Sequence, residues 1–216
     1  MSLLLRRRML LQSQAKGTLP SAYQQVEYIE STSDGGEYIN TLFFGNQNTR
    51  IVAEFQMIDA TKGCFIFGSR YGTSRAITFN IGGAPRKFVF AFDKSGNIQI
   101  VETDTQTHKV DLKNGGCLLD GYETPYTTPD SFTTSSPIAL FACNDTQQSY
   151  GYLPAHMRLF SCQIYDNGVL ARDYIPCYYE SDNVAGFVAG LYDLVNKEFV
   201  TTTKGAFLKG ADDNVL

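Results

Sequence analysis

The sequence contains no tryptophan, only two histidines and no long apolar run. A helix that crosses a bilayer needs about 20 consecutive apolar residues, so we expect no membrane span. The net charge of −4 argues against a protein that binds nucleic acid through its phosphates. Without tryptophan, any stacking on sugar rings has to rely on tyrosine and phenylalanine.

Motifs for metal, nucleotide or nucleophile chemistry are also missing. The sequence has no Cys-x-x-Cys pair, no Gly-x-x-x-x-Gly-Lys-Ser/Thr loop and no Gly-x-Ser-x-Gly turn. We therefore expect no cofactor and no zinc site. The odd number of cysteines, several in apolar stretches, predicts buried free thiols in a chain made in a reducing compartment. They are Cys64, Cys117, Cys143, Cys162 and Cys177.

One stretch invites comparison with glycoside hydrolases, which need two carboxylates beside the scissile bond. Glu102 and Asp104 would share one face of a strand. Laminarinase-type hydrolases carry a second glutamate two or three positions further on, where this chain has Gln106 and Thr107. The chain is therefore not expected to be an enzyme. His108 and His156 form no metal pair, and both histidines are expected to face solvent.

The residues that are abundant suit strands and tight turns: 13 tyrosines, 15 phenylalanines and 19 glycines. Apolar residues alternate with polar ones at 51–57, and no helical stripe of useful length appears after residue 22. Asn167-Gly168 between two strand-like runs predicts a hairpin over 159–175. We therefore predict an all-β fold, a two-sheet antiparallel jelly-roll sandwich spanning residues 19–216.

A short basic leader, residues 1–18, precedes this domain. The first 22 residues carry four basic and no acidic side chains, so the rest of the chain carries −8. The apolar runs beside the arginines are too short for a secretory signal. The leader is either a frayed tail or a docking segment for a partner. The docking residues would be Leu3, Leu4, Arg6, Arg7, Arg8, Leu10 and Leu11.

Tyrosine-bearing polar segments are candidates for sugar binding, because sugars present both apolar C–H faces and hydroxyls. Such residues are expected in loops at the ends of the sandwich. The candidates are Arg70, Tyr71, Tyr122, Tyr126, Asn144, Asp145, Tyr150 and Tyr152. Calcium has weaker support: Asn144-Asp145 and Asp166-Asn167 offer oxygen ligands, but such pairs more often bond within their own turn.

Several segments resemble a family of phage and prophage virion proteins with a laminin-G-like, concanavalin A-like jelly roll. The resemblance lies in residues 19–32 (LPSAYQQVEYIEST), 38–41 (YINT), 158–168 (RLFSCQIYDNG), 172–178 (RDYIPCY) and 190–196 (GLYDLVN). It implies a sandwich on a tail, fibre or capsid surface that binds or decorates rather than catalyses.

Three functions follow as expectations. The first is a virion-associated, lectin-like adhesion module that binds other virion proteins and host or mucosal glycans. The second is a structural decoration protein without a sugar ligand, and the third is a glycoside hydrolase relative. The resemblance implies that the chain is made in the bacterial cytoplasm and incorporated into the virion. A homo-oligomer fits the sequence, which leaves its symmetry open.

Overall fold

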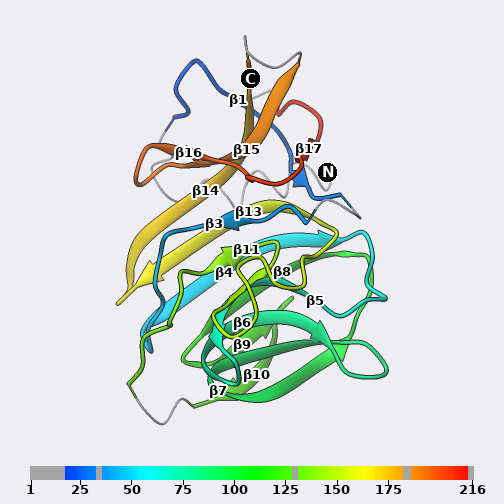
Figure 1. Cartoon of the computed structure of the whole chain (residues 1–216), viewed down its shortest axis with the longest axis vertical. Helices are drawn as coiled ribbons and strands as arrows, with labels where there is room; N and C mark the ends of the chain where they lie inside the picture. The colour runs from blue at the N-terminus through cyan, green and yellow to red at the C-terminus, as the bar shows by residue number, and fades with distance from the viewer. Residues whose placement is uncertain (1–17, 33–35, 128–130, 182–185, 214–216) are drawn as a thin grey trace.

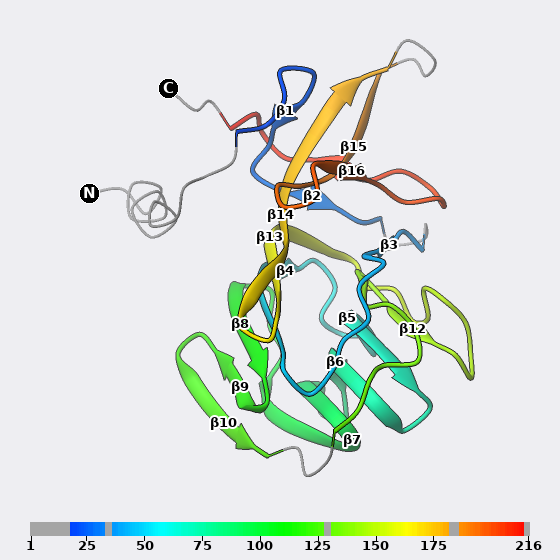
Figure 2. The same cartoon turned by 90° about the vertical axis from the view of Figure 1, so that its left-hand side faces the viewer.

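The computed structural model describes residues 18–32, 36–127, 131–181 and 186–213. This part of the chain is all-β, without a helix, and its two sheets pack as a sandwich, consistent with the predicted jelly roll. Figure 2 shows the two layers, with β8 and β4 in one and β5 and β6 in the other. Residues 1–17 of the predicted leader lie outside the described residues, and with them Leu3, Leu4, Arg6, Arg7, Arg8, Leu10 and Leu11.

The large sheet is built around a continuous row of eight antiparallel strands. In spatial order they are β10 (Tyr122–Tyr126), β9 (Gly115–Leu119), β8 (Thr107–Lys113), β4 (Thr49–Met57), β13 (Met157–Asp166), β14 (Val169–Glu180), β15 (Phe187–Asp193) and β16 (Glu198–Val200). Three short strands complete it: β1 (Gln24–Gln25) pairs with β14, while β2 (Ile29–Glu30) pairs with both β13 and β17 (Leu208–Lys209).

The small sheet has the order β3 (Ile39–Asn40), β11 (Ala139–Leu140), β5 (Cys64–Tyr71), β6 (Ser74–Gly82) and β7 (Lys87–Glu102). A further strand, β12 (Cys143–Asp145), pairs with β5 in parallel. It is the one parallel pair among the named strands of the described chain. This pairing brings the segment after residue 142 to the end of β5.

The core follows from the alternation predicted at 51–57. Ile51, Ala53, Phe55 and Met57 are buried in β4, and the residues between them are partly exposed. The ring of Phe55 contacts two rings of the small sheet, Phe79 and Phe88, at centroid distances of 5.7 and 5.8 Å. Period-2 patterning thus directs one face of each sheet into a shared aromatic core.

The predicted hairpin at Asn167-Gly168 is confirmed. Both residues have positive φ, 50° and 80°, as a two-residue hairpin turn requires. A second hairpin of this kind, which was not predicted, joins β9 to β10 through Asp120 and Gly121. Tyr122 and Tyr126 therefore lie on a strand, so their expected place in a long loop is wrong.

The predicted burial of the cysteines is confirmed, since all five are buried and free. No helix in the described ranges combines the length and the apolar character needed to cross a membrane.

Candidate functional site

Six of the eight candidate binding residues gather at one end of the small sheet. We call Arg70, Tyr71, Asn144, Asp145, Tyr150 and Tyr152 the β5-end cluster. The parallel β5–β12 pair places Asp145 opposite Arg70, and Nε of Arg70 donates to Oδ2 of Asp145 at 2.7 Å. The Asp145 side chain is only 1% exposed, so this ion pair is largely shielded from water.

The two Asx residues of the cluster support its loop. Oδ1 of Asp145 accepts hydrogen bonds from the backbone N–H groups of Gln147 and Gly72. Asn144 is fully buried; its amide donates to the Pro137 carbonyl and accepts from the Gly151 N–H. These polar atoms are engaged within the chain, so Asn144 and Asp145 act here as scaffolding for the loop.

The exposed part of the cluster is aromatic. Tyr71 and Tyr150 are 48% and 46% exposed. The Arg70 guanidinium lies over the rings of Phe65 and Tyr152, at 4.8 and 5.3 Å from their centroids. Two accessible tyrosines thus belong to the cluster, Tyr71 next to Arg70 in the chain and Tyr150 in the segment after β12, while Asp145 and two rings fix the Arg70 guanidinium.

The remaining candidates, Tyr122 and Tyr126, lie on β10, at the edge of the other sheet. Tyr122 is 64% exposed. Tyr126 is half-buried, and its ring meets Phe90 edge-to-face at 6.2 Å. Tyr126 therefore packs between the layers, and these two tyrosines form no joint surface with the β5-end cluster.

The oxygens considered for calcium accept hydrogen bonds from other groups of the chain. Oδ1 of Asp166 accepts from the amides of Asn46 and Asn167, each at 2.8 Å. Within the described ranges, no group of three or more His, Cys, Asp or Glu side chains is arranged to hold a metal ion.

Glu102 and Asp104 do not share one face of a strand, contrary to the expectation from the sequence. β7 ends at Glu102, so Asp104 lies beyond the strand and does not extend one strand face with Glu102. Oδ1 of Asp104 instead accepts a hydrogen bond from the Gln106 N–H at 2.6 Å.

The expectation that both histidines face solvent is wrong for His108. It is 6% exposed and packs against Phe55 and Phe88. Its Nδ1 lies 2.6 Å from Asp120 and its Nε2 lies 2.9 Å from Asp104. His108 alternates with the core residues Val110 and Leu112 in β8, and that pattern was the available signal for its burial.

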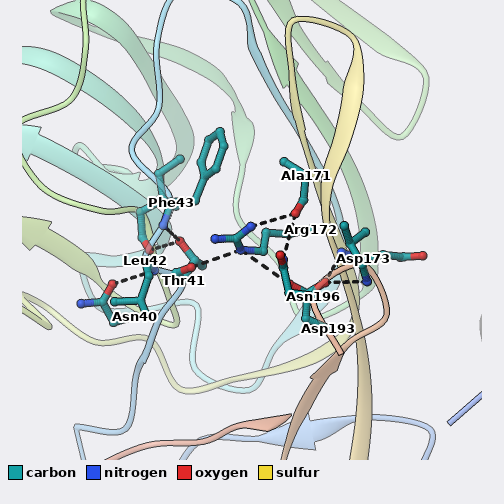
Figure 3. Close-up of polar contacts among 11 residues, drawn as sticks. Asn40, Thr41, Leu42, Phe43, Ala171, Arg172, Asp173, Asp193 and Asn196 are labelled. Atoms are coloured by element: carbon teal, nitrogen blue, oxygen red, sulfur yellow. Dashed lines mark hydrogen bonds and ion pairs between the residues drawn. The ribbon is translucent and has the colours of Figure 1, made fainter. Parts of the chain in front are cut away.

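The segments that carry the family resemblance meet in a polar network, which we call the Arg172 clamp (Figure 3). Arg172 on β14 donates to the carbonyls of Ala171 and Thr41 at 2.8 and 3.3 Å. Its Nε also lies 3.5 Å from Oδ2 of Asp193, at the end of β15. The clamp thus ties the end of β3 in the small sheet to two strands of the large sheet.

Asp193 is the acceptor at the centre of the clamp. It is 2% exposed, and its Oδ1 accepts from the N–H groups of Asp173 and Val195, both at 3.0 Å. Its Oδ2 accepts from the Asn196 amide at 2.5 Å. Nearby, burial raises the pKa of Tyr174. The conspicuous polar residues of the closing motifs are therefore used to hold the sandwich together.

No protein family and no curated protein matches this sequence.

Proposed function

We propose that this chain is a lectin-like adhesion module displayed on a phage particle. The proposal draws on the resemblance of residues 19–32 and 158–196 to virion proteins and on the all-β sandwich. The observation that carries the binding role is the pair of exposed tyrosines, Tyr71 and Tyr150, on the two segments that the Arg70–Asp145 pair joins.

The chemistry of this surface suits a glycan. A tyrosine ring offers an apolar face to sugar C–H groups, and its hydroxyl exchanges hydrogen bonds with sugar hydroxyls. Because Asp145 and two rings already hold Arg70, little side-chain entropy is lost on binding. Tyrosine without tryptophan favours weak single-site binding, which many copies on one particle would strengthen through avidity.

Binding of the full chain to an array of host capsule and mucin glycans tests this role. We expect binding that falls at least about tenfold in a Tyr71→Ala/Tyr150→Ala double variant. Tyr122→Ala is the matched control, because Tyr122 is even more accessible but lies on β10. Absence of binding to every glycan, or equal loss in the control, would refute the lectin role.

A structural decoration role is the second candidate, and one observation favours it. β10 pairs with β9 alone among the described strands, which leaves one side of β10 open to a neighbouring subunit. The leader would then attach the chain to other virion proteins. Deleting residues 1–18 is expected to abolish incorporation into particles, and unchanged incorporation would contradict docking by the leader.

A further inference from the structure

A hollow of about 720 Å³ lies against the small sheet. Its wall combines the start of β6, the middle of β7 and the segment after residue 130 (Figure 2 shows β6 and β7 side by side). Its lining includes Gln47, Ser74, Arg75, Asp93, Phe132 and Thr133. The volume falls within the range of small-molecule pockets.

Asp93 is the unusual member of this wall. It is 5% exposed, and its Oδ2 has no hydrogen-bond partner among the residues that the structure describes. Buried polar atoms are nearly always paired, because leaving them unpaired costs free energy. Oδ2 itself is closed off from solvent, so a ligand in the hollow would donate to the other oxygen of this carboxylate, Oδ1.

The backbone of the pocket is strained at two of its residues. Asp93 and Arg75 both have positive φ, 66° and 49°, which side chains other than glycine rarely adopt. Strain of this kind persists where the surrounding structure enforces it, and it is enriched at ligand-binding sites. Asp93 is thus held in an unfavourable conformation with an unused acceptor.

The other groups of the wall indicate the chemistry of the ligand. The exposed Arg75 makes no ion pair with any described residue, so the wall offers one cation besides one carboxylate. Gln47 accepts a hydrogen bond from the Phe132 N–H, and Ser74 and Thr133 add hydroxyls. A neutral ligand rich in hydroxyls matches this set, because a hydroxyl can donate to a carboxylate and can accept from a guanidinium.

The pocket and the β5-end cluster share one hairpin, since Tyr71 pairs with Ser74 across the β5–β6 turn. We propose that the Asp93 pocket binds one neutral, hexose-sized sugar residue, with Asp93 accepting from its hydroxyls. This assignment rests on the proposed function in taking a carbohydrate as the ligand. It adds a specific site for one residue of the glycan, next to the exposed tyrosines.

Ligand-observed NMR on the full chain tests the assignment with D-glucose, D-galactose, D-mannose, N-acetyl-D-glucosamine and D-glucuronic acid at millimolar concentration. At least one neutral sugar should bind, and Asp93→Asn should weaken that binding on the order of tenfold, as loss of a charged hydrogen-bond partner does. Glucuronic acid should bind less well than glucose, because its carboxylate would meet Asp93. Asp111→Asn, outside the pocket, is the control.

The melting temperature of the variant is a second measurement, and it does not depend on finding the right sugar. Asn tolerates positive φ as Asp does and leaves no carboxylate unpaired in the buried site, so Asp93→Asn should raise the melting temperature of the sugar-free protein. The assignment is overturned if no sugar binds or if Asp93→Asn binds equally well. Glycan-array binding that depends on Tyr71 and Tyr150 but not on Asp93 would leave the proposed function standing without this pocket. Monosaccharide binding that depends on Asp93, with no binding on the array, would support the pocket and refute the proposed adhesion function.

Discussion

At the scale of single residues, burial sets the chemistry of the thiols. It raises the pKa of Cys64, Cys117, Cys143 and Cys177 to about 12 from an ordinary 9.0, and it raises that of Cys162 as well. Only the thiolate is a good nucleophile. In the folded protein these cysteines therefore act as small apolar side chains.

Stability is expected to fall in alkaline solution. A thiol whose folded pKa lies above its unfolded value stabilises the protein fully below pH 9, and this contribution is lost as the pH rises towards 12. Each such thiol should then cost about 1.4 kcal/mol per pH unit across that window. Urea unfolding followed at pH 8, 9 and 10 measures the slope, and an aromatic disulfide reagent should label the thiols only after unfolding. Rapid labelling of the native protein at pH 8 would contradict this.

Residue patterns in the sequence predicted some of these environments. Apolar context predicted the buried thiols, and the alternation with Val110 and Leu112 would have placed His108 inward. The ion pair of Arg70 with Asp145 could not be predicted, because the two residues lie 75 positions apart and meet only through the parallel β5–β12 pair. The unpaired oxygen of Asp93 is likewise a product of tertiary packing.

At the scale of elements, short turns set the register of the hairpins. Asn167-Gly168 was recognised in the sequence, whereas Asp120-Gly121 has the same signature and was overlooked. Because of that turn, residues 122–126 form β10 and not the expected loop, and their two tyrosines lie at the edge of the large sheet. Two-residue turns are thus the most informative local signals in this chain, while very short strands such as β3 depend on partners far along the sequence.

Gly121→Ala isolates the conformational demand of the β9–β10 turn. Gly121 has φ 88°, and a Cβ there would meet nothing within 4 Å, so any loss reflects backbone strain alone. We expect a loss of about 1 kcal/mol in the free energy of unfolding, measured by urea titration. Gly63→Ala is the matched control, because Gly63 lies outside the positive-φ region and its added Cβ would come no closer than 3.4 Å to Arg86. Equal effects at the two sites would refute the role of the turn.

At the scale of the whole molecule, the Arg172 clamp joins the two sheets. Asp193→Ala would remove the carboxylate that accepts from the Asp173 and Val195 N–H groups and forms an ion pair with Arg172. Breaking a buried pair of this kind costs about 3–5 kcal/mol. We expect a loss of that size in urea unfolding.

The Arg50–Asp111 pair supplies the control for the clamp. It joins β4 to β8 at 2.8 Å, but the Arg50 side chain is 44% exposed. Asp111→Ala should cost under about 1 kcal/mol, because exposed ion pairs contribute little. Comparable losses in the two variants would mean that the clamp contributes no more than a surface pair.

The strand order has a consequence for the synthesis of the chain. β1, β2 and β3 pair with β14, β13 and β11, so these three strands meet those partners only after residues 139–180 have been made. Pairing between such distant segments carries a large loop-closure entropy and is slow. During synthesis, β1, β2 and β3 therefore remain unpaired for most of the time. The sandwich is completed late, when the C-terminal third leaves the ribosome.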